Sequence, residues 1–162
     1  MLIKGRILGT DGRTIAGAKI DVWQTNDDGF HDVHQKGIQP DFNLRGVFRT
    51  GEDGSYHFWG AKPRCYPFPG DGPVGKLLGA LGRHPFRPAH LHYILEADGL
   101  ETLVSHIFDP DDVYIDTDAV FGVKESLLAK FELIDDVTRI REEGAEGPFY
   151  EVVHDFVLAP AH

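Results

Sequence analysis

Short segments that alternate apolar and polar residues, separated by turns, constrain the fold of this chain more than any other feature. The 162 residues include 19 glycines and 10 prolines, and helical patterning is scarce. Strand-like segments cover residues 3–8, 18–23, 46–50, 55–59, 90–95, 102–108, 129–134 and 150–158. Asp11-Gly12 and Asp53-Gly54 are typical of β-hairpin turns. Many short strands with such turns predict a mainly β fold, an antiparallel β-sandwich with a few short helices.

Two stretches carry helical patterning, and a third carries little pattern at all. Residues 74–81 can form two helical turns, and residues 118–129 can hold another short helical piece. The stretch from Arg64 to Pro88 contains five prolines. So long a connection inside a compact domain is usually functional. The length predicts a single domain over residues 1–162.

The bulk composition excludes several classes of partner. The net charge of −10 argues against nucleic acid or an anionic membrane as a partner. No apolar run approaches the roughly 18 residues needed to span a bilayer, and the first residues do not resemble a signal peptide. The single cysteine, Cys65, excludes an internal disulfide and fits a reducing compartment. We therefore expect a cytoplasmic protein.

His90 and His92 are the first candidates for a functional site. They stand two residues apart in a segment rich in apolar, aromatic and β-branched residues, and side chains at positions i and i+2 leave the same face of a strand. The two imidazoles should therefore lie side by side, with Leu91 and Tyr93 on the opposite face. Such a pair suits a metal ion. The alternative is two half-buried histidines bonded to their neighbours, and the spacing alone leaves both interpretations open.

Several segments, taken in order, resemble the intradiol ring-cleavage dioxygenases, most closely the hydroxyquinol and catechol 1,2-dioxygenases. The matching segments are GRIL (5–8), DG (11–12), DVWQTNDDG (21–29), FNLRG (42–46), FRT (48–50), DG (53–54), YPFP (66–69), DGPVG (71–75), GRHP (82–85), RPAHLH (87–92) and DAVFGVK (118–124). No single segment is decisive, but the ordered set is specific and covers nearly the whole chain. The resemblance implies a β-sandwich core and a mononuclear non-haem iron(III). It also implies intradiol cleavage of hydroxyquinol or catechol by O2, which gives a ring-opened dicarboxylate.

Carried over by position, the resemblance assigns the metal ligands. His90 and His92 match the two histidine ligands of the family, and Tyr66 matches the tyrosine that leaves the metal when substrate binds. The other tyrosine of the family is missing, because the matching position, eight residues after Trp23, holds His31. Imidazole is also a competent iron ligand, so we expect His31 to bind the metal. The alternative is a vacated position with His31 turned to solvent.

A histidine at position 31 changes the charge of the site that the resemblance implies. Two phenolates and one hydroxide balance the three charges of iron(III), whereas a neutral imidazole leaves one charge uncompensated. Iron(II) should then form more easily, and other divalent ions that favour imidazole become competitors. A catalytically weakened or inactive metal-binding or catechol-binding β-sandwich is therefore the second hypothesis. A carrier-like sandwich of the transthyretin kind, which needs no metal, is the third.

The resemblance also implies which residues surround the diol. Arg87 matches an arginine near the bound diol, where a fixed cation can stabilise developing negative charge, so Tyr66 and Arg87 are the expected catalytic residues. His106 stands where the family carries a polar side chain near the ring, and its spacing favours a pocket wall over a metal ligand. Cys65 is as readily explained by packing. The expected substrate-binding residues are Asp28, Phe30, Arg64, Cys65, Arg87 and His106.

The resemblance finally bears on partners and domain organisation. The expected partners are a small aromatic diol and O2. Catechol and hydroxyquinol enzymes of the family carry an N-terminal helical region that forms the dimer contact, whereas the first predicted strand here begins at the start of the sequence. We therefore expect residues 1–162 to form a catalytic domain without that region. This expectation leaves the choice between a monomer and a homo-oligomer open.

Overall fold

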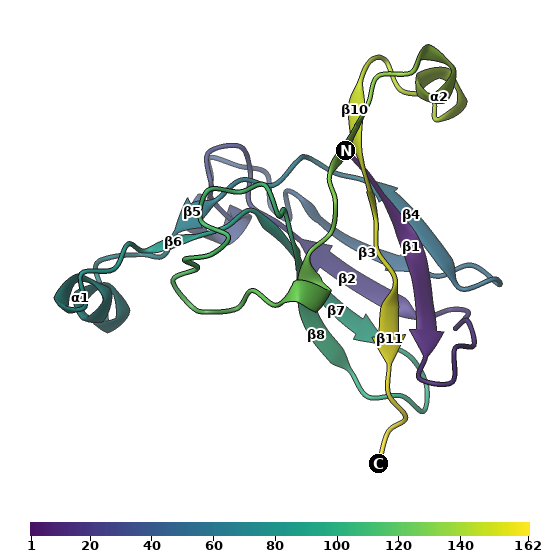
Figure 1. The fold of residues 1–162 in the computed structure, drawn as a ribbon, viewed down its shortest axis with the longest axis horizontal. Coiled ribbons are helices and arrows are strands. Elements are labelled where there is room, and N and C mark those ends of the chain that lie inside the picture. Colours follow the sequence, from purple (N-terminus) through teal and green to yellow (C-terminus); the bar gives the residue numbers. More distant parts are fainter.

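The computed structural model describes residues 1–162 as two packed β-sheets with few helices (Figure 1). One sheet has the order β11-β1-β10-β9, with β4 on the other edge of β1, and the second has the order β3-β2-β7-β8. The strands of the first sheet are β1 (Leu2–Gly9), β4 (Ser55–Trp59), β9 (Glu132–Ile134), β10 (Phe149–Val153) and β11 (Phe156–Leu158). Those of the second sheet are β2 (Lys19–Trp23), β3 (Arg45–Arg49), β7 (His90–Glu96) and β8 (Leu103–Phe108).

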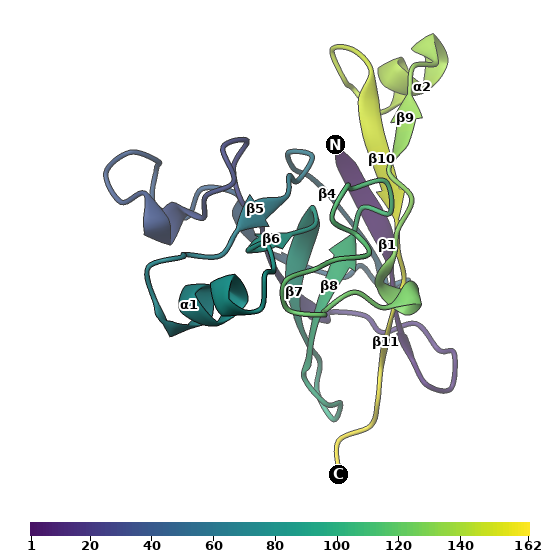
Figure 2. The same ribbon diagram turned by 60° about the vertical axis from the view of Figure 1, so that its left-hand side comes forward.

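The helices and one small sheet lie outside the sandwich. The α-helices are α1 (Pro73–Ala80) and α2 (Val137–Glu142), and single 3-10 turns form at η1 (Asp32–His34) and η2 (Glu125–Leu127). The small sheet pairs β5 (Tyr66–Pro67) with β6 (Phe86–Arg87). Both views show this pair and α1 projecting from one end of the sandwich (Figures 1 and 2). Neither α-helix has the length and apolar character of a membrane span.

The hydrophobic core lies between the two sheets and fixes which side chains face outward. Ile3 and Ile7 of β1 and Leu91, Tyr93 and Leu95 of β7 are all fully buried in one cluster. Side chains alternate along a strand, so the residues between these positions of β7 leave the opposite face of the second sheet. The predicted β-sandwich is confirmed, and the outward face of β7 carries the candidate site.

The pairing of β1 departs from a purely antiparallel arrangement. Most neighbouring strands are antiparallel as predicted, but β1 runs parallel to both β10 and β11. The two late strands keep one register along β1, since Lys4 lies opposite Val153 and Ile7 opposite Phe156. The segment predicted as one strand over residues 150–158 is therefore a single ribbon with a short break. At the break, the Asp155 carboxylate accepts the backbone N–H of Arg6 at 2.7 Å.

The second predicted hairpin turn connects the two sheets instead. Asp53-Gly54 does form a turn, but β3 pairs with β2 and β4 pairs with β1. Phe48 and Phe58, one from each strand, stack across the core with ring centroids 4.7 Å apart. The hairpin prediction was wrong because burying these two faces against each other places the strands in opposite layers. The turn at Asp11-Gly12 is a short hairpin as predicted, with a bridge between Leu8 and Thr14.

The short helical piece predicted within residues 118–129 is confined to the 3-10 turn η2, and residues 118–124 contain no helix. The Asp118 carboxylate accepts the backbone N–H groups of Val120 and Gly122, at 3.4 and 2.8 Å. This side chain competes with the helical hydrogen-bond pattern. Phe121 also has a φ of +56°, which a right-handed helix excludes. The helix predicted over residues 74–81 is confirmed as α1, while the strand predicted over residues 129–134 forms only at its end, as β9.

Replacing Tyr93 with phenylalanine is expected to stabilise the protein. Tyr93 is fully buried and its hydroxyl has no hydrogen-bond partner. Burial also raises the pKa of this phenol well above its usual value. Removing an unpaired buried hydroxyl should raise the free energy of unfolding by about 1 kcal/mol, measured by urea denaturation. The matched control is Tyr56→Phe, which should destabilise, because the Tyr56 hydroxyl donates to the His154 carbonyl at 2.7 Å. Equal losses in both variants would contradict this expectation.

Candidate metal centre

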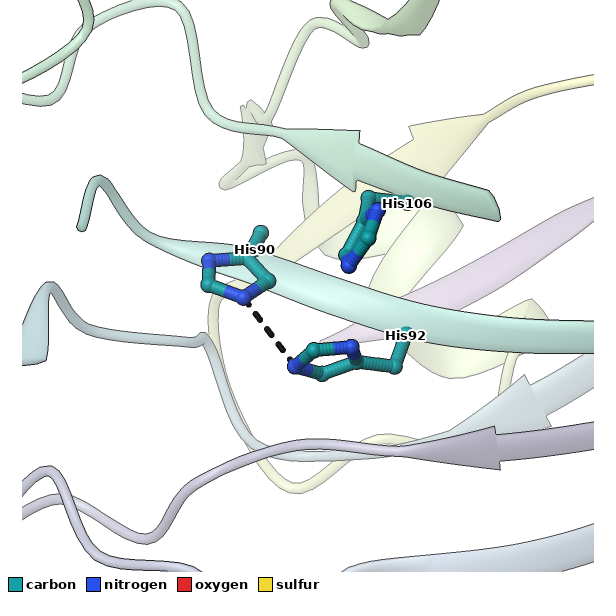
Figure 3. Close-up of side chains that lie close together, drawn as sticks. All are labelled: His90, His92 and His106. Carbon is teal, nitrogen blue, oxygen red and sulfur yellow. Dashed lines mark hydrogen bonds between the residues drawn. The ribbon is translucent and has the colours of Figure 1, made fainter. Parts of the chain in front are cut away.

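Three imidazoles gather on the outward face of the second sheet. His90 and His92 leave the same face of β7, and their Nε2 atoms are 3.1 Å apart. His106 lies opposite His92 on β8 and points toward the same space (Figure 3). One nitrogen from each ring lies within 4.8 Å of the other two. The antiparallel pairing of β7 with β8 therefore brings together a group of side chains that could hold a metal ion.

Tyr66 joins the pair on β7. Its hydroxyl oxygen lies 3.2 Å from Nε2 of His90 and 3.4 Å from Nε2 of His92. Donor atoms about 2.0 to 2.2 Å from one metal ion lie roughly 2.8 to 3.6 Å from each other at right or tetrahedral angles. The three donor-to-donor distances fall in this range, so these atoms fit one face of a metal coordination shell. The structure brings together three of the four predicted ligands, and their binding of metal stays a prediction.

Neighbouring groups fix the orientation of both β7 imidazoles. The Nδ1 atom of His90 lies 2.6 Å from the Pro88 carbonyl oxygen, so Nδ1 carries the proton and Nε2 keeps its lone pair toward the centre. Such hydrogen bonds orient metal-binding histidines in proteins. His92 instead stacks on Trp23, its neighbour on β2, with centroids 4.8 Å apart and planes 6° apart. The motif DVWQTNDDG includes Trp23, but the sequence alone did not predict this stacking.

His31 lies beside the other donors rather than in open solvent. Its ring centroid is 5.3 Å from that of Tyr66 and 5.5 Å from that of His92. Its Nδ1 atom is buried without a hydrogen-bond partner, which fits an atom available to a metal ion. Gly29 permits this approach, because it has a φ of +81° and an added Cβ would lie 3.1 Å from Cβ of Tyr66. His31 lies outside the 4.8 Å group of the three sheet imidazoles.

Arg87 and Asp118 form a buried ion pair next to this centre. Arg87 lies directly opposite Tyr66 in the small sheet, and its Nη1 atom is 3.0 Å from Nε2 of His90. Its Nε atom donates to the Asp118 carboxylate at 3.3 Å. Both residues are almost fully buried. Asp118 begins the motif DAVFGVK, yet nothing in the sequence pattern indicated that its carboxylate would meet Arg87.

Burial and neighbouring positive charge keep the imidazoles neutral. Burial lowers the pKa of His92 to about 2, and the nearby His106 adds to this effect. Burial and then Arg87 lower the pKa of His106 to about 4. The pKa values of His90 and His31 are also lowered, mainly by burial. Neutral imidazoles present lone pairs at neutral pH, as metal binding requires.

Tyr66 differs from the imidazoles, because burial raises its pKa whereas Arg87 acts in the opposite direction. A metal ion next to its oxygen would favour the phenolate, as metals do for coordinated acids. The donor set of neutral imidazoles, one phenol and an unpartnered Nδ1 therefore fits a mononuclear metal ion.

The expected substrate-binding residues separate into two groups. Arg87 and His106 lie with the imidazoles. Phe30 is 44% exposed, on the loop before His31. Asp28, Arg64 and Cys65 line an open depression whose lining includes five aspartates and none of the imidazoles. Consecutive side chains of an extended segment point to opposite sides, which explains why Cys65 and Tyr66 diverge although they are neighbours in sequence.

Comparison with known proteins agrees with this architecture. Residues 1–160 match the protein family described as "Dioxygenase". The chain is 69% identical over 160 residues to a hydroxyquinol 1,2-dioxygenase of Rhizobium sp. (strain MTP-10005), covering 98% of this chain and 54% of that protein. It is 46% identical over 159 residues to a 6-chlorohydroxyquinol 1,2-dioxygenase of Cupriavidus pinatubonensis (strain JMP 134 / LMG 1197), covering 98% and 53%.

Solved structures give the same result. The structure of hydroxyquinol 1,2-dioxygenase from Pseudomonas putida DLL-E4 superposes with a TM-score of 0.89 at 42% identity, covering 99% of this chain and 56% of that chain. Catechol 1,2-dioxygenase from Acinetobacter sp. ADP1, inhibited by bound mercury, superposes with a TM-score of 0.94 at 35% identity, covering 99% and 52%.

The fold and the site define a β-sandwich protein with a cluster of histidine and tyrosine side chains that could hold a metal ion. The chain belongs to the intradiol ring-cleavage dioxygenase family. The resemblance predicted from the ordered motifs is therefore confirmed. The chain spans about half the length of the curated relatives it matches.

Proposed function

We propose that residues 1–162 form a catalytic domain for intradiol cleavage of a catechol-type ring by O2. The carbon–carbon bond between the two hydroxylated carbons breaks, and both atoms of O2 enter the ring-opened dicarboxylate, so no external reductant is required. The observation that carries the proposal is the set of donor atoms of Tyr66, His90 and His92, which lie 3.1 to 3.4 Å apart. Relatives named hydroxyquinol 1,2-dioxygenase support hydroxyquinol as the substrate in preference to catechol.

We infer that His31, Tyr66, His90 and His92 would hold a mononuclear iron(III). When bound, the ion would act as a Lewis acid that withdraws electrons from the diol and makes its ring reactive toward O2. The Tyr66 oxygen lies beside both β7 imidazoles and can accept one proton of the diol. A protonated tyrosine in this partly buried site is consistent with the raised pKa of its phenol, caused mainly by burial.

The remaining polar residues would bind and orient the diol. Arg87 is a fixed, buried cation 3.0 Å from His90, and it can stabilise negative charge that develops on the diol oxygens. His106 can form a hydrogen bond to a ring substituent. We propose that Asp28, Phe30, Arg64 and Cys65 contribute to substrate selection from the neighbouring loop and depression. The single cysteine supports a reducing compartment, and we propose the cytoplasm.

One observation favours a second candidate function. His31 occupies the position at which the family carries a tyrosine, and a neutral ligand there leaves the charge of iron(III) less compensated. With this change, the protein would bind a divalent metal ion and a diol but would not turn the diol over efficiently. The two candidates share the same fold and the same ligand positions, so they differ in metal identity and in oxygen consumption.

Metal analysis followed by oxygen uptake distinguishes the two candidates. The purified protein is analysed for iron and zinc, its visible spectrum is recorded, and oxygen uptake is measured with hydroxyquinol and with catechol. The proposed function predicts bound iron, a visible phenolate-to-iron absorption band and oxygen uptake that is faster with hydroxyquinol. A colourless protein that holds zinc and consumes no oxygen even after iron loading would favour the second candidate.

A further inference from the structure

The loop at residues 118–122 is built around one buried carboxylate. Both oxygens of Asp118 are occupied: Oδ1 accepts from Nε of Arg87 at 3.3 Å, and Oδ2 accepts from the backbone N–H of Gly122 at 2.8 Å. Asp118 is 3% exposed, and it is the only carboxylate within salt-bridge distance of Arg87. A buried cation without a partner is costly, so this carboxylate decides where the guanidinium can remain.

The same loop is tied to the strand that carries Arg87. The backbone N–H of Ala119 donates to the carbonyl of Phe86 on β6 at 3.1 Å, and Arg83 donates to the carbonyl of Asp118 at 3.0 Å. Arg83 also covers the ring of Phe121 at 3.9 Å. Phe121 has a φ of +56°, a conformation that costs free energy and persists only where surrounding contacts impose it. These contacts hold the carboxylate in place relative to β6.

Gly122 leaves room for the guanidinium. A Cβ atom added there would lie 3.0 Å from Nη2 of Arg87 and 3.1 Å from Oδ2 of Asp118. The loop therefore contacts Arg87 on two sides, through the carboxylate at Nε and through the bare glycine at Nη2. The third nitrogen, Nη1, is the one directed toward His90, at 3.0 Å.

We propose that Asp118 is the positioning residue that holds the Arg87 guanidinium toward the metal centre, so that Nη1 faces the bound diol. The effect of this role on the diol rests on the proposed function, whereas the positioning of Arg87 does not depend on it. A long arginine side chain loses considerable rotamer freedom when it is fixed. Without Asp118, part of the binding free energy of the diol would offset the cost of ordering Arg87. Asp118 supplies the ordering before the diol arrives.

The isosteric variant Asp118→Asn tests the positioning directly. An amide has one acceptor oxygen, so it cannot serve both Arg87 and Gly122, and its NH2 group must face one of their N–H groups. The Arg87 Nε–H resonance, assigned by its absence in Arg87→Gln, should exchange slowly with solvent in the wild type. Its exchange should accelerate by about tenfold in Asp118→Asn. Unchanged exchange would overturn the proposal.

The matched control is Glu151→Gln, which removes a largely buried carboxylate paired with Lys4 and Arg139 in the other sheet. It should leave the Arg87 resonance unchanged. Gly122→Ala keeps both charges and crowds Nη2, so it gives a second test if Asp118→Asn fails to fold, and it should also accelerate exchange. The proposed link would be wrong if Glu151→Gln changed the exchange of the Arg87 resonance as much as the loop variants do. It would also be wrong if neither loop variant changed that exchange.

A double-mutant cycle then tests the consequence for the diol. Iron-loaded protein is titrated with 4-nitrocatechol without oxygen, so that binding is observed by absorbance without turnover. Asp118→Asn should weaken binding by about tenfold when Arg87 is present, and by less than about twofold when it is added to Arg87→Gln. The proposal would be overturned if the two substitutions weakened diol binding independently, so that their effects multiplied. Tighter diol binding in Asp118→Asn would also overturn it. If the wild type binds no diol, the proposed function fails, and the Arg87 resonance alone decides the positioning role.

Discussion

The His31→Tyr variant is expected to take up oxygen with hydroxyquinol roughly tenfold faster or more than the wild type, because metal-bound charge contributes several kcal/mol to such barriers. His31 lies 5.3 Å from Tyr66 and 5.5 Å from His92, measured between ring centroids. A phenolate at this position would restore a strong anionic donor and balance the charge of iron(III). The variant should also retain more iron(III) and show a more intense visible absorption band.

Two further variants separate ligation from general effects of the substitution. His31→Ala should weaken metal retention without adding colour, because it removes a buried nitrogen that has no other partner. His57→Tyr is the matched control: it adds a phenol at an exposed position of β4 in the other sheet, and should change neither colour nor metal content. If His31→Tyr and His31→Ala both leave metal content, colour and oxygen uptake at wild-type values, His31 is a bystander. The metal would then depend on three protein ligands.

Local alternation made part of this site predictable from sequence. His90 and His92 leave one face of β7 while Leu91 and Tyr93 enter the core, as the two-residue period of a strand requires. The ordered motifs predicted Tyr66 and Arg87 through resemblance, since the proline-rich stretch that carries them has no periodic pattern. The structure gives these two residues a physical relation, because they are opposite each other in the β5–β6 pair.

Contacts between distant segments could not be predicted in the same way. Trp23 stacks on His92 only because β2 and β7 pair in one particular register. Asp118 reaches Arg87 only because its loop folds back on β6. The hairpin expected at Asp53-Gly54 failed for the same reason, since the choice of sheet for each strand depends on packing across the core and not on the turn itself.

The His90→Gln and His92→Gln variants are expected to lose metal affinity by roughly 100-fold or more, since even the outer partners of metal ligands are worth 10- to 100-fold. Each variant removes one imidazole from the donor pair that lies 3.1 Å apart and keeps a polar side chain of similar length. Metal that binds the folded state alone also stabilises it by linkage. The melting temperature of the wild type should therefore rise on loading with iron and fall again after chelation.

Thermal unfolding with and without metal measures this effect separately from intrinsic stability. In both variants the metal-dependent rise in melting temperature should disappear, whatever the stability of the metal-free protein. His57→Gln is the matched control, because His57 is exposed on β4 in the other sheet, and its metal-dependent rise should equal that of the wild type. His90 forms the additional bond to the Pro88 carbonyl, so His90→Gln should also lower the melting temperature of the metal-free protein more than His92→Gln does. If His90→Gln kept the metal content of the wild type, the two β7 histidines would not form the metal site. The proposal of iron chemistry on this sandwich would then have lost its structural basis.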